Sequence, residues 1–321
     1  MESNCASIRR TFAGRLKAMR SKNSFLRAVA IIISHVSAAI AVAFCSYQIF
    51  RFGLLLAIPA YTLAIFLIGS RYRAIANIVH ECTHYAFTID RELNNIIGKV
   101  LSIPLFSSFE AYRHAHLTHH IHTGDYEKDL DFRDFRQFRF HERINRKAVL
   151  RHLYLTLTLQ HVPSYIGRIF YVKEEAWIYN FLRFSYVACL IAPIILFGPF
   201  SDPALIVWGF VLAPYAIALQ IITYWSDALD HGGLFENSDP LFQTRNSVVS
   251  NSLLRLVMFP RNDCFHLIHH LFPQVPVADL PACHDELLSD PTYASLEHKL
   301  SKRTASVWFR SPRPTTKSQE A

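Results

Sequence analysis

Four long apolar runs constrain this chain more than any other feature of its sequence. Residues 28–50 contain no Asp, Glu, Lys or Arg, and as a helix they are long enough to cross the ~30 Å of hydrocarbon in a bilayer. Residues 52–69 follow after a single arginine, and residues 184–198 and 204–225 form a second apolar pair. Half of the chain is hydrophobic (51%), which is unusual for a soluble protein. The sequence therefore predicts an all-α membrane protein with four transmembrane helices.

The four runs are expected to pair into two hairpins. Only Arg51 separates the first two runs, and Pro-Phe-Ser-Asp-Pro at 199–203 is a plausible turn between the last two. Two hairpins place both termini and the polar segments 71–180 and 226–321 on one side of the membrane. Basic residues precede the first run, opposed there only by Glu2, and the positive-inside rule assigns their side to the cytoplasm: Arg9, Arg10, Arg15, Lys17, Arg20, Lys22 and Arg27.

We expect one membrane domain between two polar tails. Residues 1–27 are predicted to be a basic cytoplasmic N-terminal tail, and residues 291–321 a polar C-terminal tail. Residues 28–290 form the membrane domain, whose polar segments build a cytoplasmic helical cap. Within that domain, segments 96–109 and 153–171 are too short or too mixed to span, and they are typical of helices that lie in the membrane interface.

Nine of the 17 histidines fall into a few tight groups: His80 and His84, His116, His119 and His120, His231 alone, and His266, His269 and His270. Residues three and four apart share one face of a helix, so each group is expected to aim its imidazoles at a common point. Imidazole is a good ligand for Fe, Zn, Cu or Ni, and one ion takes only about four to six donors. Nine histidines therefore predict two metal ions.

The positions of these groups relative to the apolar runs add a second constraint. His80 and His84 follow the second run, and Asp227 and His231 follow the fourth. All nine histidines are thus predicted to converge just outside the bilayer, where a lipid-dissolved chain can reach them. For Cys82 and Cys264, which sit beside the groups, we expect burial rather than ligation. The remaining lone histidines are expected to be ordinary core or surface residues: His35, His141, His152, His161, His284 and His298.

The three larger groups resemble the three histidine boxes of the membrane fatty acid desaturase superfamily. The sequence HHLFPQVP at 269–276 resembles the family's HHLFPxVP ending. Gly124-Asp125 with Asp129 and Asp131 is similar to the acidic stretch that often follows the second box. The resemblance runs from about residue 70 to about residue 290.

The resemblance implies a non-haem di-iron enzyme that uses dioxygen as co-substrate. Two Fe²⁺ ions would be bound by the boxes and by a further pair before the third box, Asp227 and His231. Asp227 stands where some relatives have Asn, and holding a bound water or orienting His231 is the alternative to direct ligation. The implied metal ligands are therefore His80, His84, His116, His119, His120, His231, His266, His269, His270 and Asp227.

The activity that the resemblance favours is desaturation, the introduction of a carbon–carbon double bond into a fatty acyl chain or a related lipid or secondary metabolite. A hydroxylase or ketolase of the same superfamily, acting on a lipid or small metabolite, is the alternative. The substrate itself cannot be read from these residues.

Two alternative hypotheses, from other functional classes, remain open at this point. His80-Glu81-Cys82-Thr83-His84 is also HExxH, the signature of zinc metalloproteases, in which the glutamate is a general base. Such a site needs only one further ligand, and it leaves six of the nine histidines unexplained. A metal transporter is the second alternative, although transport sites usually lie near the membrane midplane. For Glu81 a structural role and a hydrogen bond to a neighbouring imidazole are equally expected, while His114 and His122 suit surface or supporting roles.

Electrons must come from outside this chain. His231-Gly232-Gly233 lacks the proline of a cytochrome b5 His-Pro-Gly-Gly motif, and the chain has neither a ferredoxin-like cysteine run nor a GxGxxG motif after a strand pattern. We therefore expect an electron donor of the ferredoxin, rubredoxin or cytochrome b5 type with its reductase. Membrane lipid is the other expected partner. The net charge of +8 is explained by membrane topology, and no nucleic acid partner is expected.

Overall fold

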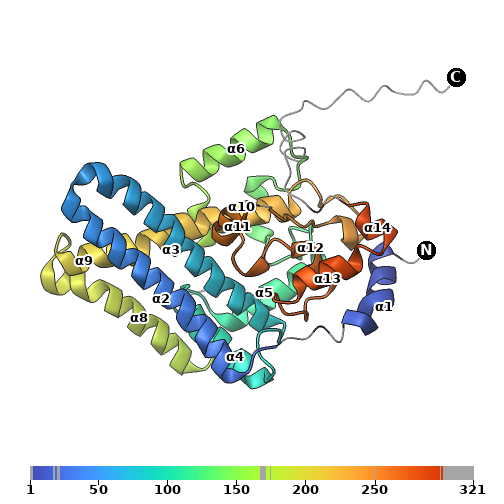
Figure 1. Ribbon diagram of the computed structural model, residues 1–321, viewed down its shortest axis with the longest axis horizontal. Coiled ribbons are helices and arrows are strands. Elements are labelled where there is room, and N and C mark those ends of the chain that lie inside the picture. Colours follow the sequence, from blue (N-terminus) through green and yellow to red (C-terminus); the bar gives the residue numbers. More distant parts are fainter. Residues whose placement is uncertain are drawn as a thin grey trace.

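The computed structural model describes residues 3–16, 19, 22–166, 171–173, 175–249, 251–296 and 298, and these fold mainly into helices (Figure 1). Within these ranges there is no β-strand, and an isolated backbone bridge pairs Asn23 with Thr88. The prediction of an all-α protein is confirmed for this part of the chain. Lys17, Arg20 and residues 299–321, which make up most of the predicted C-terminal tail, lie outside the described residues.

Four helices are long and apolar enough to cross a membrane, and they coincide with the four predicted runs. The first consists of α2 (Phe25–Ile49) and the 3-10 turn η1 (Phe50–Phe52). The second is α3 (Leu54–Thr83) and the third is α8 (Trp177–Phe197). Only 6% of the most apolar stretch of the first helix and 11% of that of the third are buried inside the protein, as expected of helices that face lipid.

The fourth long helix, Asp202–His231, changes its hydrogen-bonding pattern along its length. It starts as α9 (Asp202–Val207), continues as the π-helical segments η3 (Trp208–Leu212) and η4 (Pro214–Leu219), and ends as α10 (Gln220–His231). Pro214 has no N–H to donate, and a local π-helical adjustment is a common response to proline in a membrane helix. The helix therefore continues past the proline and delivers His231 at its last residue.

Three of the long helices extend well beyond the predicted spans. The predicted second span covers residues 52–69, whereas α3 runs on to Thr83 without a break. Helix α8 begins at Trp177 rather than at residue 184, and the fourth helix ends at His231 rather than at residue 225. A helix of 30 residues is about 45 Å long, which exceeds the ~30 Å of a bilayer core. His80 thus lies in the last turn of the spanning helix and His84 is its C-terminal cap residue. His80, His84 and His231 are therefore positioned by the ends of long apolar helices, whereas the other six predicted histidine ligands lie on shorter helices.

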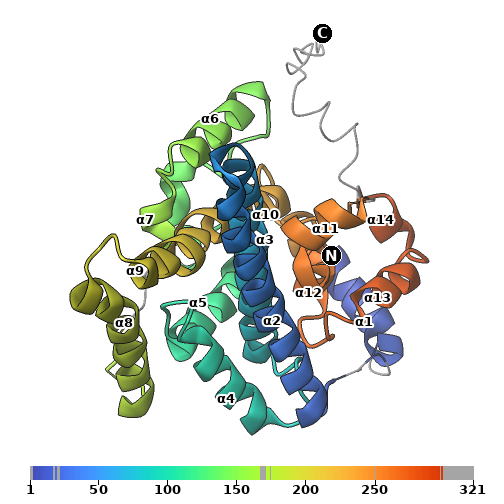
Figure 2. The ribbon, with the colours of Figure 1, turned by 60° about the vertical axis from the view of Figure 1, so that its left-hand side comes forward.

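Helix α3 is the centre of the packing. It contacts α2, α4 (Arg91–Ser102) and η4, and Figure 2 shows α2, α3 and α4 side by side. Gly69 permits the closest approach between α3 and the fourth helix. A Cβ atom at this position would lie 2.5 Å from the Cβ of Ala218 and 2.9 Å from the backbone nitrogen of Leu219. The absence of a side chain at Gly69 is therefore a condition of this helix pair.

The polar segments fold into short helices, two of which carry histidine groups: α5 (Phe109–His122) and α12 (His266–Leu271). In both views α12 lies with α13 and α14 (Figures 1 and 2). The other short helices are η2 (Arg133–Phe138), α6 (Arg146–Leu157), α7 (Val162–Tyr165), η5 (Pro240–Phe242), α11 (Ser252–Met258), η6 (Pro260–Asn262), α13 (Leu280–Leu287) and α14 (Pro291–Ala294). The predicted interfacial segments 96–109 and 153–171 contain parts of α4, α6 and α7, while residues 167–170 lie outside the described residues. Their depth relative to a membrane stays a prediction.

Part of the predicted N-terminal tail forms a helix that packs against the rest of the protein. Helix α1 (Asn4–Leu16) buries one face, which carries Cys5, Ile8, Phe12 and Leu16. These residues belong to the same buried cluster as Leu267 and Leu271 of α12. The spacing of three and four residues places them on one side of a helix, but the surrounding basic residues hid this pattern in the sequence analysis.

Residues on both sides of the predicted boundary at residue 290 contact one another. Asp290 caps α14, since its side chain accepts a hydrogen bond from the backbone N–H of Tyr293 at 2.9 Å. The Tyr293 side chain is fully buried, and its hydroxyl accepts a hydrogen bond from the amide of Asn246 at 2.9 Å. The folded unit therefore includes the first residues of the segment that was predicted to be a tail.

We predict that Gly69→Ala destabilises the protein by about 1–3 kcal/mol, because the added methyl group overpacks the contact of α3 with Ala218 and Leu219. Gly14→Ala in α1 is the matched control, since its Cβ would meet nothing within 4 Å. Thermal unfolding of both variants in detergent checks the prediction. A Gly69→Ala variant that melts no lower than Gly14→Ala would contradict the close packing described here.

Candidate metal centre

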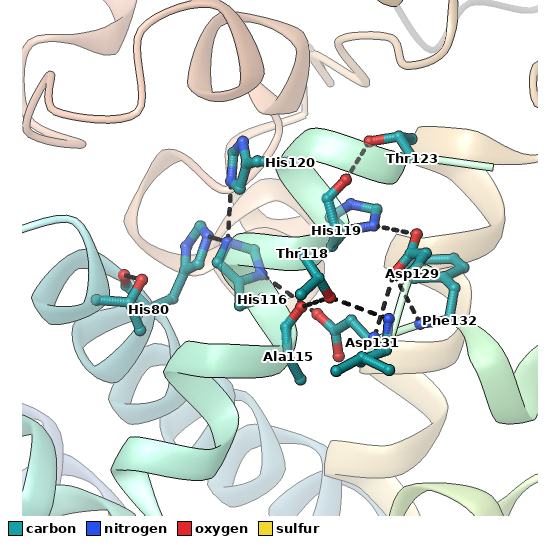
Figure 3. Close-up of polar contacts among 12 residues, drawn as sticks. His80, Ala115, His116, Thr118, His119, His120, Thr123, Asp129, Asp131 and Phe132 are labelled. Carbon is teal, nitrogen blue, oxygen red and sulfur yellow. Dashed lines mark hydrogen bonds and ion pairs between the residues drawn. The ribbon is translucent and has the colours of Figure 1, made fainter. Parts of the chain in front are cut away.

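The structure brings all nine predicted histidine ligands together in two groups. Within each group the candidate ligand atoms lie within 4.8 Å of one another, and no cysteine belongs to either group among the described residues. Figure 3 shows four of these histidines and the aspartates beside them. The first group contains His80, His84, His116, His120 and His269, and the second contains His119, His231, His266 and His270.

The second and third boxes are each divided between the two groups, which differs from the expectation that each aims at one common point. In α5, His116 and His120 join the first group while His119 joins the second. In α12, His266 and His270 join the second group while His269 joins the first. Residues four apart share a helical face, whereas adjacent residues point about 100° apart. Each H-x2-H-H box therefore gives two imidazoles to one group and one to the other.

Hydrogen bonds at the outer ring nitrogens fix which nitrogen faces inward. The Nδ1 atom of His116 lies 3.2 Å from Asp131 and that of His119 lies 2.8 Å from Asp129 (Figure 3). The Nδ1 atom of His231 lies 3.1 Å from the carbonyl oxygen of Gln243. Because these oxygens accept hydrogen bonds, Nδ1 carries the proton and Nε2 presents a lone pair.

The inward nitrogens crowd together in both groups. The Nε2 atom of His116 lies 2.8 Å from Nε2 of His80 and 3.0 Å from Nε2 of His120. In the second group, the Nε2 atoms of His231 and His266 are 2.9 Å apart. Buried lone pairs that face one another need a donor or a cation between them.

The Nε2 atom of His84 gives a direct test of whether the site suits a metal ion. This atom is buried and has no hydrogen-bond partner. A buried polar atom without a partner is unfavourable, and it calls for an explanation such as an ion. The orphaned nitrogen and the imidazole-only donor set together fit a transition metal such as iron in the first group.

The electrostatics of the site favour neutral imidazoles. Burial, reinforced by neighbouring histidines, lowers the pKa of the histidines that lie outside the spanning helices: His84, His120, His266, His269 and His270. His119 is different: burial opposes its protonation, but the Asp129 carboxylate outweighs this effect and raises its pKa. Neutral imidazole is the form that binds metals. A low pKa therefore keeps the lone pairs free at neutral pH.

Asp129 is part of a buried hydrogen-bonded turn. Besides its contact with His119, its carboxylate accepts hydrogen bonds from the backbone N–H groups of Asp131 and Phe132, both at 3.1 Å. The turn thus places Asp131 beside His116 and Asp129 beside His119. From the sequence these aspartates were recognisable only as part of an acidic stretch.

Asp230 is a supporting residue that sequence reasoning missed. Its carboxylate lies 3.8 Å from Nδ1 of His266 and accepts a hydrogen bond from the Ser247 hydroxyl at 3.2 Å. Its place directly before His231 was visible in the sequence, but the partner 36 positions further along was not.

Asp227 belongs to neither histidine group. Its carboxylate accepts a hydrogen bond from the Tyr165 hydroxyl at 2.8 Å and lines the cavity beside the histidines. Its predicted ligation, direct or through water, stays a prediction.

Glu81 faces away from both groups and has a structural partner. Its carboxylate accepts two hydrogen bonds from the Arg261 guanidinium, at 2.5 and 3.0 Å. The backbone N–H of Val277 lies 3.5 Å from the other carboxylate oxygen. This buried ion pair links α3 to the segments on either side of the third box. In a zinc protease the glutamate of HExxH would act on a metal-bound water, and this geometry does not favour that role.

The residues for which we expected ordinary roles lie outside both groups. His114 is exposed and His122 is half-buried. Cys82 and Cys264 are buried, and burial raises the pKa of Cys264 to about 12, so that its thiol stays protonated at neutral pH. His152 contacts the Tyr224 hydroxyl through Nδ1 at 2.6 Å.

A cavity of about 240 Å³ lies against both groups. Its walls include His80 and His116 of the first group and His119, His231 and His266 of the second. The other lining residues are mixed in character, for example Leu105, Phe132, Tyr215, Gln220, Asp227 and the ion pair of Arg73 with Asp263. This is the space in which a substrate can lie beside the histidines.

The chain matches the family model of fatty acid desaturases over residues 52–299, a range that contains all nine histidines. It is 27% identical to the dihydrorhizobitoxine desaturase of Bradyrhizobium elkanii, over 74% of this chain and 70% of that protein. It is 23% identical to a chloroplastic omega-3 fatty acid desaturase of Glycine max, over 65% of this chain but only 50% of that protein. A delta(12)-fatty-acid desaturase of Vernicia fordii is 33% identical over 37% of this chain and 32% of its own length.

We predict that Asp129→Asn weakens metal binding about 10–100-fold, because the amide no longer holds His119 in its metal-binding orientation as a carboxylate does. Glu127→Gln, which removes an exposed carboxylate from the same stretch, is the control and should change little. Metal content after equilibration with graded concentrations of a chelator measures the difference. Equal retention of metal by the two variants would show that Asp129 does not support the site.

Proposed function

This chain belongs to the fatty acid desaturase family, and we propose that it is a membrane oxidoreductase that forms a carbon–carbon double bond in an oxygen-dependent reaction at a di-iron centre. The observation that carries the proposal is the meeting of nine histidines from four distant segments in two groups. If each histidine group binds one iron ion, all nine histidines are accounted for. A single zinc or a storage site would leave this division unexplained.

The proposed ligands of one iron are His80, His84, His116, His120 and His269, and those of the other are His119, His231, His266 and His270. When bound, the iron pair supplies the activation of dioxygen that is needed to oxidise an unactivated C–H bond, which no side chain can do alone. The protein supplies the geometry. Asp129, Asp131 and the carbonyl of Gln243 orient three imidazoles, and the end of α3 positions His80 and His84.

The walls of the cavity would hold the substrate and exclude water. Phe132, Phe135 and Leu130 offer an apolar surface beside the histidines, and Tyr165 with Asp227 offers a polar one. Loss of two hydrogens requires adjacent carbons of the substrate to be held next to the metal centre, so these side chains would set the position of the double bond. The similar proteins include desaturases of fatty acids and of dihydrorhizobitoxine, and we propose a fatty acyl chain, a related lipid or a secondary metabolite as substrate.

For the topology we propose two helical hairpins with the metal centre on the cytoplasmic side. Helices α2 and α3 are joined by only a short turn and pack together, and α8 contacts α9 after a short connection. Basic residues near the start of the chain, such as Arg9, Arg10, Lys22 and Arg27, supply the signal for cytoplasmic placement. The short helices that carry or cover the histidines would then form a cytoplasmic cap.

Two electrons per turnover must reach this centre, and we propose that they come from a ferredoxin, rubredoxin or cytochrome b5 type protein with its reductase. The formal net charge of +8 would attract an acidic donor over long distances.

We predict that His269→Ala lowers product formation more than about a hundredfold. Loss of a residue that only hydrogen-bonds a metal ligand typically lowers metal affinity or activity about 10–100-fold, and loss of a ligand itself should have a larger effect. His114→Ala is the control and should retain activity, since His114 is exposed and belongs to neither group. Both variants are expressed in membranes with a reductant and the products are identified by mass spectrometry. Desaturation gives a product that lacks two hydrogen atoms. A product with one added oxygen atom would instead show that the enzyme is a hydroxylase and would contradict our proposal.

We also predict that electron delivery slows as salt rises. Raising ionic strength from about 0.01 to 0.15 M shortens the screening length from about 30 to 8 Å, which weakens steering between a basic enzyme and an acidic donor. Stopped-flow reduction by a ferredoxin at several salt concentrations measures the effect. A rate that does not depend on salt would count against an acidic donor guided by charge.

A further inference from the structure

Helix α1 lies outside the residues that match the family model, yet it belongs to the structure around the third histidine box. The match begins at residue 52, whereas α1 covers Asn4–Leu16. Its buried face shares one apolar cluster with Leu267, Ile268 and Leu271 of α12. In Figures 1 and 2, α1 lies beside α13, close to α12.

Helix α12 needs support from outside because it is short. It has six residues, and three of them are the third-box histidines that serve both groups. A helix of this length is not stable alone in water, and its last carbonyl groups have no partners within the helix. The residue before it, Phe265, provides no side-chain cap.

Arg9 of α1 supplies partners for this end of α12. The Nη2 atom of its guanidinium donates a hydrogen bond to the carbonyl oxygen of His270 at 2.8 Å. Its Nε donates to the carbonyl oxygen of Leu271 at 3.1 Å. A positive charge at the C-terminal end of a helix is also favourable for the helix dipole. The planar guanidinium can make both bonds at once, which a lysine ammonium cannot do in the same geometry.

The rest of α1 is fixed around Arg9. The Asp239 carboxylate accepts hydrogen bonds from the backbone N–H groups of Asn4 at 2.7 Å and Cys5 at 3.4 Å. At the other end of the helix, Arg15 pairs with Glu286 of α13 at 2.9 Å. The buried face of α1 and its contacts with Asp239 hold the helix, so that the Arg9 side chain meets α12 in one defined position. The ion pair of Arg15 is exposed and contributes little.

From these contacts we propose that Arg9 is a positioning residue for the metal centre. By holding the carbonyl end of α12, it fixes the backbone of His269 and His270, which belong to different histidine groups. Loss of Arg9 would therefore loosen both groups together. This inference rests on the proposed function in that the two groups bind metal.

The test compares the full-length protein with Arg9→Ala, Arg9→Lys and, as control, Arg15→Ala, which removes an exposed ion pair of the same helix. Iron release to a chelator is measured in detergent after loading with ferrous iron. We expect release from Arg9→Ala to be about 10–100-fold faster than from the unmodified protein, in line with residues that support metal ligands. Release from Arg9→Lys should be intermediate, because the ammonium group keeps the charge and can donate a hydrogen bond but lacks the planar guanidinium. Release from Arg15→Ala should resemble that from the unmodified protein.

Hydrogen exchange of the backbone amides of residues 266–272 is measured on the same proteins before iron is added. Faster exchange in Arg9→Ala than in Arg15→Ala supports the role of Arg9, even if the unmodified protein binds no iron and the proposed function fails. Equal exchange and equal iron release in these two variants overturn the inference while leaving the proposed function intact. If Arg9→Ala does not fold, the same comparison is made with Arg9→Lys, and identity with Arg15→Ala again overturns it.

Discussion

The crowding of nine imidazoles in a buried space is the constraint on which the rest of this structure depends. Nε2 atoms lie 2.8 to 3.1 Å apart in both groups, and lone pairs that face one another at such distances are unfavourable unless a donor or a cation lies between them. The protein holds three of the imidazoles through hydrogen bonds to their outer nitrogens, which come from Asp129, Asp131 and the carbonyl of Gln243. The long helices place His80, His84 and His231.

The same constraint explains why the membrane helices are longer than their apolar runs. Helix α3 carries His80 in its last turn, the fourth long helix ends at His231, and the packing at Gly69 brings the two helices together. The ion pair of Glu81 with Arg261 then ties the end of α3 to the segment before the third box. Membrane spanning and site assembly are thus properties of the same helices. A substrate dissolved in the bilayer would meet the centre where these helices leave the apolar region.

The four long apolar helices and the meeting of the nine histidines could be predicted from the sequence, because uncharged runs and H-x3-H or H-x2-H-H spacings are local patterns. The sequence was not sufficient for the division of His119 from His120, since spacing defines the face of a helix but not which neighbour meets that face. Asp230 and Arg9 were missed for a related reason: their partners lie far away along the chain. The docking of α1 was hidden because its apolar stripe is interrupted by basic residues.

The central claim is that the two groups hold two iron ions. Iron and zinc per chain, measured by mass spectrometry of the protein purified in detergent and quantified by amino acid analysis, test it most directly. The account predicts about two irons for each chain and a loss of activity when they are removed. An active preparation without iron, or one with a single tightly bound zinc, would contradict it.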